Sequence, residues 1–216
     1  MYRLFLKRLI DIVFSFIGIV VLALPMIVFA FIVKGEDPGP VFFRQKRIGI
    51  HKTQFGLLKF RSMKMSTPHD MPTHMLENPE RYILKCGRWM RKMSIDELPQ
   101  LFNIFTGKMS IIGPRPALWN QDDLIAEREK YGANDIKPGL TGWAQINGRD
   151  ELEIPVKAKL DGEYVAALNA GHCKGFAMDC KCFFGTIKSV LNHDGVVEGG
   201  TGEMKREEKE KETAGK

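Results

Sequence analysis

The residues best suited to chemistry are two adjacent carboxylates, Asp96 and Glu97, which follow a basic run at residues 85–92. The spacing from Ser94 to Glu97 fits a capping box, whereas Pro99 fits better if Asp96 is the cap and the proline lies in the first helical turn. In both cases, backbone N–H groups at a helix start would stabilise the anions and could hold a phosphate or a metal–phosphate. Helix capping alone also explains the pair, because caps are commoner than sites.

Two cations, Lys59 and Arg61, flank Phe60 in a predicted β-hairpin formed by residues 41–47 and 54–63. Strand alternation places both cations on one face, where an anion between them would relieve their repulsion. A solvated basic edge that blocks aggregation explains them equally well.

Arg115 lies between Pro114 and Pro116, which restrict its backbone to extended geometry. A rigidly held arginine is suited to bidentate contact with a phosphate, and we favour that interpretation over a surface arginine in a stiff turn. Arg91, at the end of the basic run, is delivered next to the carboxylates.

Residues 137–149 are punctuated by glycines and carry the polar side chains of Gln145 and Arg149. Such a stretch can approach a nucleotide closely, although it matches neither GxGxxG nor a P-loop. Two helices are predicted after it, at residues 156–168 and 176–191, and the first carries Asp161 and Tyr164. The four cysteines lack the paired spacing of a zinc site, so reduced thiols are expected.

An uncharged run at residues 12–33 must place these groups relative to a membrane. Its 22 residues are long enough to cross a hydrocarbon core of about 30 Å at about 1.5 Å per residue. Pro25 would kink the helix, and basic residues flank both ends, which favours both flanks on the cytoplasmic side. A spanning helix and a re-entrant helix bent at Pro25 both remain open.

The chain has 216 residues, of which 44% are hydrophobic, and this supports one membrane-associated domain with a real core. Its net charge of +6 indicates anionic partners. The sequence predicts an α+β, mostly helical fold with three parts, a membrane helix at residues 1–34, a cytosolic catalytic domain at 35–195 and a disordered tail at 196–216. Amphipathic helices at residues 80–92 and 119–131 are expected, the first in the membrane interface. No nucleic acid partner is expected, because the interleaved aromatics of a single-strand platform are missing.

Several motifs in fixed order resemble the bacterial sugar transferase family, the monotopic phosphoglycosyl transferases that start glycan assembly on a polyprenol phosphate. They are Lys-Arg-x-x-Asp at residues 7–11, the Pro25-broken apolar run, and residues 59–63, 94–101, 113–116 and 138–142. The resemblance covers residues 2–191 and looks like the minimal catalytic form. It implies a re-entrant helix, a homodimer, and a place among the lipids of the bacterial inner membrane at its cytoplasmic face.

The resemblance also implies the reaction. Asp96 would attack the β-phosphate of a UDP-sugar and expel UMP, and undecaprenyl phosphate would then attack the aspartyl–phosphosugar. Mg²⁺ is implied, with Asp96 and Glu97 as its protein ligands, or with Glu97 positioning the acceptor phosphate instead. The remaining expected site residues are the phosphate-binding Lys59, Arg61, Arg91 and Arg115, the nucleotide-sugar residues Gln145 and Arg149, and Asp161 and Tyr164 with no assigned role.

The competing hypothesis is a membrane-anchored basic adaptor that binds acidic lipid or nucleic acid. It explains the charge and the apolar run, but not a carboxylate pair that faces a stiffened arginine. The sugar and the glycan pathway (exopolysaccharide, capsule, O-antigen or glycoprotein) are not given by the sequence.

Overall fold

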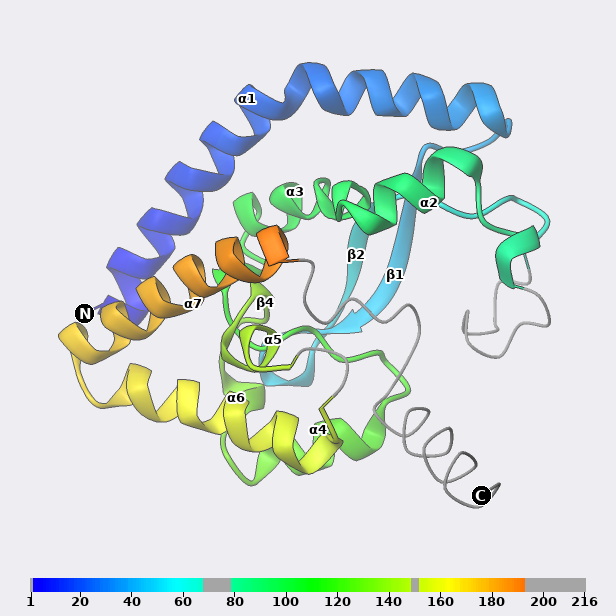
Figure 1. The fold of residues 1–216 in the computed structure, drawn as a ribbon. Helices are drawn as coiled ribbons and strands as arrows, with labels where there is room; N and C mark the ends of the chain where they lie inside the picture. The colour runs from blue at the N-terminus through cyan, green and yellow to red at the C-terminus, as the bar shows by residue number, and fades with distance from the viewer. Residues whose placement is uncertain (1, 68–78, 149–151, 193–216) are drawn as a thin grey trace.

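The structure, a computed structural model, describes residues 2–67, 79–148 and 152–192. It is mostly helical and has two small sheets, in agreement with the predicted mostly helical α+β class (Figure 1). The predicted tail at residues 196–216 lies outside the described residues, and so does Arg149.

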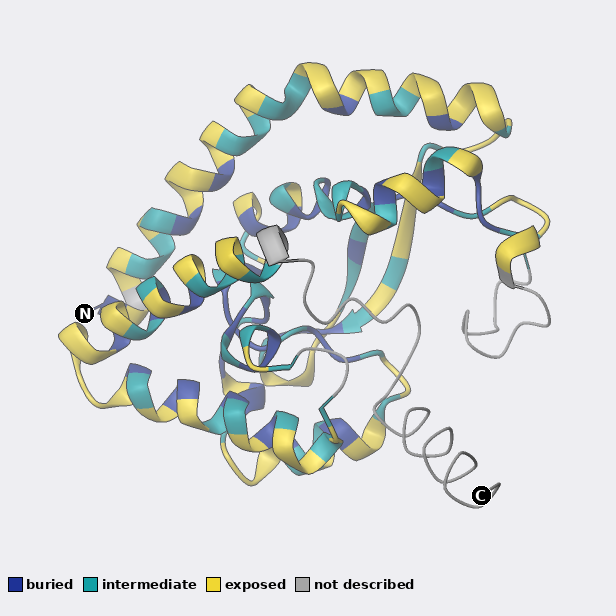
Figure 2. Ribbon diagram, viewed as in Figure 1, coloured by how far each residue is buried: buried dark blue, intermediate teal, exposed yellow. Residues whose placement is uncertain are grey.

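The N-terminal helix α1 (Lys7–Glu36) follows a π-helical turn (Tyr2–Leu6) and contains Pro25. Figure 1 shows that α1 changes direction along its length. Most of its apolar side chains are exposed (Figure 2), and it is the one helix of the described chain that is long and apolar enough to cross a membrane. The predicted uncharged run is therefore a helix that leaves most of its apolar surface exposed and packs within the chain mainly through its second half.

Both ends of α1 are tied to the rest of the protein by polar contacts. Near its start, Arg8 donates hydrogen bonds to the carbonyl oxygens of Ile104 and Phe105 at 2.7 and 2.8 Å. At its end, the Glu36 carboxylate accepts hydrogen bonds from the backbone N–H groups of Lys85 and Cys86. The Arg8 bonds add a partner for carbonyls at the end of one helix, and the Glu36 bonds satisfy N–H groups at the start of another, which have no partner within that helix.

The predicted hairpin is confirmed. Strands β1 (Phe42–Ile48) and β2 (Gln54–Phe60) pair antiparallel with Phe43 opposite Lys59, and a 3-10 turn (Ile50–Lys52) connects them.

A second sheet was not predicted. Strands β3 (Ser110–Ile112) and β4 (Gly139–Thr141) pair in parallel, and three-residue strands are too short to show a periodic pattern. Gly139 is required there, because a Cβ at this position would lie 2.1 Å from the backbone nitrogen of Gly113.

Helices of different lengths surround the hairpin and the second sheet. The helix predicted at residues 80–92 begins only at Lys85, because a 3-10 turn (Pro79–Arg81) and a bridge between Met63 and Ile83 precede it. The helix predicted at residues 119–131 is shorter than expected, and the last two predicted helices are confirmed. The helical elements after β2 are α2 (Lys85–Lys92), η5 (Ile95–Glu97), α3 (Gln100–Phe105), α4 (Asp122–Glu129), η6 (Ala133–Asp135), α5 (Trp143–Ile146), α6 (Ile154–Asn169) and α7 (His172–Asn192).

Several apolar clusters hold the elements together, and two of them support the candidate site. One contains Met26, Phe60 and Met90, and packs the second half of α1 against β2 and α2. Another contains Ile112 and Leu168, and joins β3 to α6 and α7. The first cluster lies directly beneath the turn that carries Asp96 and Glu97, since Ile95 and Leu98 pack against it.

Candidate active site

The two carboxylates lie in a 3-10 turn between α2 and α3. Neither predicted cap is formed: α3 begins at Gln100 after Pro99, and Ser94 makes no side-chain capping bond. Ser94 instead adopts a left-handed backbone with φ of 55°, which reverses the chain between α2 and the turn. Such a conformation is strained for a residue other than glycine, and strain of this kind is concentrated at functional sites.

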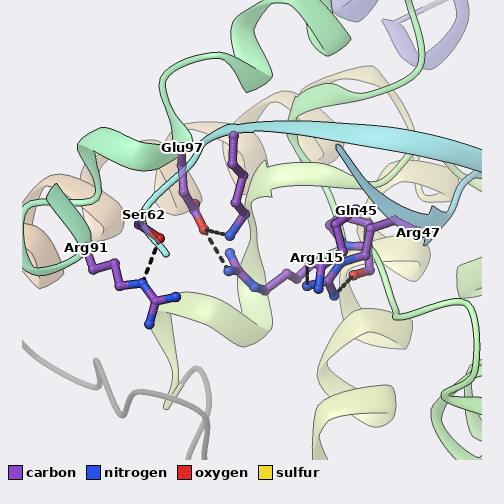
Figure 3. Close-up of polar contacts among 8 residues, drawn as sticks. Gln45, Arg47, Ser62, Arg91, Glu97 and Arg115 are labelled. Atoms are coloured by element: carbon purple, nitrogen blue, oxygen red, sulfur yellow. Dashed lines mark hydrogen bonds and ion pairs between the residues drawn. The ribbon is translucent and has the colours of Figure 1, made fainter. Parts of the chain in front are cut away.

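Glu97 is held by two cations that come from different parts of the chain. Its Oε1 atom accepts hydrogen bonds from Lys59 Nζ of β2 and from Arg115 Nη2, each at 2.9 Å (Figure 3). Burial alone would raise the pKa of the Glu97 carboxyl, but Arg115 and Lys59 outweigh burial and hold that pKa well below its usual range. We call Lys59, Glu97 and Arg115 the clamp.

Asp96 lies beside the clamp and is 8% exposed. Burial raises its pKa above the ordinary value, and Lys59 opposes this effect more than any other neighbour. The charge of Glu97 raises the pKa further, whereas Arg91 and Arg115 lower it. The structure thus brings together the predicted Asp96, Glu97, Lys59, Arg91 and Arg115, and shifts the two carboxyl pKa values in opposite directions.

Arg91 is oriented by a residue that sequence reasoning missed. Its Nε donates to Ser62 Oγ at 2.9 Å (Figure 3). Helix α2 can approach Ser62 closely because residue 87 is glycine, and a Cβ there would lie 2.2 Å from the Ser62 carbonyl oxygen. A serine two residues after β2 gave no separate signal for this contact in the sequence.

Arg61 is not brought into the clamp. Its guanidinium is buried and forms an ion pair with Asp37, the residue after α1. Asp37 also accepts a hydrogen bond from the backbone N–H of Met65 at 2.9 Å. Arg61 therefore fastens the end of β2 to the residue that follows α1.

Asp161 and Tyr164 are buried, and each is paired with a side chain of another helix. Asp161 accepts hydrogen bonds from Arg128 of α4 at 2.8 and 2.6 Å, and Tyr164 donates to Asp179 of α7 at 2.6 Å. Asp179 also binds Lys7 at 2.7 Å and the hydroxyl of Tyr2. These contacts join four distant segments, and the sequence gave no signal for them.

Gln145 is buried in α5, and neither atom of its side-chain amide has a hydrogen-bond partner within the described chain. Its Oε1 lies 3.0 Å from where a Cβ of Gly142 would be, and Gly142 in turn abuts the carbonyl of Gly113. The amide therefore lies behind the segment that carries Arg115. A buried amide without a partner is costly, so it needs a ligand or a specific reason.

Asp96 and Glu97 can form part of a magnesium site. Among the described residues there is no group of three or more histidine, cysteine, aspartate or glutamate side chains suited to a metal. Magnesium typically needs one or two carboxylates together with substrate phosphates, and this pair fits that requirement. Because Glu97 Oε1 is already bound to two cations, Asp96 and the other oxygen of Glu97 are the available ligands.

Comparison with known proteins gives a match over almost the whole chain. Residues 2–193 match the family described as bacterial sugar transferase. The chain is 37% identical over 191 residues to the uncharacterized sugar transferase EpsL of Bacillus subtilis, covering 88% of this chain and 90% of EpsL.

Two further relatives carry names that state a reaction. The UDP-glucose:undecaprenyl-phosphate glucose-1-phosphate transferase of Escherichia coli is 38% identical over 173 residues, covering 74% of this chain and 36% of that protein. The undecaprenyl-phosphate galactose phosphotransferase of Salmonella typhimurium is 33% identical over 205 residues, covering 88% and 41%. The chain thus spans well under half of these two relatives.

Proposed function

The chain belongs to the bacterial sugar transferase family, and on this premise we propose that it moves a sugar phosphate from a UDP-sugar to undecaprenyl phosphate and releases UMP. Two relatives are named for transfer of glucose-1-phosphate or galactose phosphate to that lipid, and the first is named for a UDP-sugar donor. The reaction would be the first membrane step of glycan assembly. Family membership favours this function over the adaptor hypothesis.

The observation that carries the proposal is the buried Asp96 beside the clamp. In the first half-reaction, Asp96 Oδ attacks the β-phosphorus, and the bond from that phosphorus to the bridging oxygen breaks, which releases UMP. In the second, a phosphate oxygen of undecaprenyl phosphate attacks the same phosphorus and restores the Asp96 carboxylate. A carboxylate is a competent nucleophile for such covalent catalysis.

The cations around Asp96 supply most of the stabilisation. Charge spreads over the phosphate oxygens in the transition state, so fixed positive groups lower the barrier most. Glu97 holds Lys59 and Arg115 2.9 Å from one oxygen atom, so both are in place before a substrate arrives. Magnesium, when bound, supplies further neutralisation of phosphate charge, and Gln145 and Arg149 are the candidates for contact with the nucleotide or sugar.

We also propose that α1 re-enters the face from which it starts. Its first residues bind α3 through Arg8, and its last residues bind α2 through Glu36, so both ends contact the same polar body. A straight spanning helix would put these ends on opposite sides of the bilayer. Pro25 deletes one backbone hydrogen bond and provides a physical cause for the change of direction seen in Figure 1.

We further propose that the catalytic body lies at the cytoplasmic face of the bacterial inner membrane, which the basic residues flanking α1 on both sides support. The homodimer stays a prediction.

The direct test of the reaction is to trap the intermediate. Purified protein is incubated with a panel of UDP-sugars labelled in the β-phosphate, without acceptor, and the peptide that contains Asp96 is examined by mass spectrometry. We expect a phosphosugar on Asp96 with one donor, and none with Asp96→Asn, while the exposed control Asp122→Asn behaves as wild type. UMP release at an ordinary rate by Asp96→Asn would overturn the covalent mechanism.

The topology is tested by labelling single cysteines at Phe5 and Gly35, both exposed positions near the two ends of α1. In inside-out vesicles, an impermeant thiol reagent should reach both. Protection of one of the two positions would show a spanning helix.

A further inference from the structure

The β1–β2 hairpin positions both cations of the clamp, Lys59 and Arg115. Lys59 of β2 contacts Glu97 directly, whereas Arg115 lies in a segment without helix or strand between Gly113 and Ala117. Such a segment has no regular series of backbone hydrogen bonds that fixes its position. Beside the contact of its own side chain with Glu97, the backbone at Arg115 is held by contacts that its neighbours make.

On the N-terminal side of Arg115, the second sheet provides the anchor. The Gly113 N–H donates to Thr141 O at 2.8 Å, and the Gly139 N–H donates to Pro114 O at 2.9 Å. These bonds stop one residue before Arg115.

On the C-terminal side, strand β1 provides the anchor. Arg47 Nη1 donates to the Pro116 carbonyl at 2.9 Å, and the Ile48 N–H donates to Ala117 O at 3.0 Å. Proline has no N–H, so the carbonyl is the only backbone hydrogen-bonding group that Pro116 offers. Arg47 binds that carbonyl, directly adjacent to Arg115.

Arg47 is itself oriented by a neighbour on the same strand. Gln45 Oε1 accepts from Arg47 Nε at 3.1 Å and from Nη2 at 2.8 Å. Residues two apart on a strand share a face, which makes this contact possible. The Gln45 contact occupies one edge of the planar guanidinium and leaves Nη1 directed at Pro116, and Figure 3 shows both side chains at the backbone end of Arg115.

We infer that Arg47, oriented by Gln45, is a positioning residue that sets where Arg115 meets the diphosphate of the donor. The inference rests on the proposed function for its substrate, but the placement of Arg115 against Glu97 can be measured without turnover. Strand β1 acts through Arg115, and strand β2 acts through Lys59. One hairpin thus fixes the spacing of the two cations that converge on Glu97.

A double-mutant cycle tests this inference. Arg47→Ala should lower kcat/KM by about tenfold to a hundredfold, the range for losing one hydrogen bond from a charged donor. Because Arg47 acts through Arg115, it should add no further loss in an Arg115→Ala background. The control Arg44→Ala removes an exposed cation from the same strand and should leave turnover unchanged.

The second readout needs no substrate. The 13C chemical shift of the Glu97 carboxyl carbon, which responds to its contact with Arg115, is compared at one neutral pH in the four variants of the cycle. Arg115→Ala should move that resonance, Arg47→Ala should move it in the same direction by less, and the two changes should not add. If Arg47→Ala does not fold, Gln45→Met replaces it, with a smaller loss of the same sign.

The two readouts separate the two hypotheses. A wild-type chain that turns over no donor defeats the proposed function, while the Glu97 resonance still decides whether Arg47 positions Arg115. Losses in kcat/KM that multiply, or a Glu97 resonance that responds to Arg115→Ala but not to Arg47→Ala, would overturn the role given to Arg47.

Discussion

Replacing Glu97 with glutamine tests how strongly the clamp contributes to the folded state. The change keeps the shape and removes the charge that Lys59 and Arg115 share at 2.9 Å. Removing one partner of a buried ion pair costs about 3–5 kcal/mol. The Lys59 and Arg115 side chains keep 17% and 28% exposure, and glutamine still offers an acceptor, so we expect about 2–3 kcal/mol.

Thermal unfolding of detergent-purified protein measures this cost. For a chain of this size, about 2–3 kcal/mol lowers Tm by about 4–12 °C. The matched control is Glu80→Gln, because Glu80 pairs with Arg88 at 3.2 Å on the surface, with both side chains at least 60% exposed. That variant should melt within about 2 °C of wild type.

The same prediction fixes the direction in which the stabilisation by Glu97 changes with pH. The folded-state pKa of Glu97 lies below its unfolded value of about 4.5, so its contribution to stability is complete above that value and is lost as pH falls toward the folded-state pKa. The gap in Tm between wild type and Glu97→Gln should stay constant from about pH 7 to about pH 5 and narrow in stronger acid. A variant that melts like the Glu80→Gln control at every pH would refute the clamp.

Three further predictions follow from the same geometry. Burial raises the pKa of Asp96, and Lys59 is the main group that lowers it. Lys59→Met should therefore reduce turnover and move the acid limb of the pH profile of turnover to higher pH. An unmoved acid limb would show that Lys59 does not set the pKa of Asp96. Asp179→Asn weakens the contacts to Lys7 and Tyr164, so it should lower Tm by several degrees while turnover per folded molecule stays near wild type. A large loss of turnover at an unchanged Tm would contradict this structural role. Removing Mg²⁺ with a chelator should abolish UMP release without changing Tm, and full activity after chelation would exclude the metal.

The sequence predicted what depends on local pattern. The uncharged run indicated a long apolar helix, two strand-like runs around a turn at Gly49 indicated the hairpin, and the two prolines indicated a held arginine at position 115. These features are set by neighbours close in the chain, so a single sequence displays them. The expectation that Asp96 or Ser94 caps a helix was wrong, because the left-handed Ser94 starts a separate 3-10 turn and the next helix begins only after Pro99.

The partners of buried charges could not be predicted. Arg61 was expected to bind substrate phosphate together with Lys59, but Asp37, which lies 24 residues earlier, pairs with its guanidinium. Asp161 pairs with Arg128 in another helix. Strand or helix periodicity gives the face on which a side chain lies, not which distant segment covers that face.

The clamp bears on the choice between an enzyme and an adaptor for anionic lipid. An adaptor would need its cations open to the ligand, yet Lys59 and Arg115 are both bound to Glu97, so a phosphate must compete with a carboxylate inside the protein. That competition weakens ground-state binding. It is useful when the charge to be stabilised develops later, because a transition state with greater negative charge on its oxygens competes better than the ground state. Among the contacts of the described residues, Lys59 and Arg115 are hydrogen-bonded to Glu97 and not to Asp96. This is the arrangement expected if Glu97 holds the cations and Asp96 reacts.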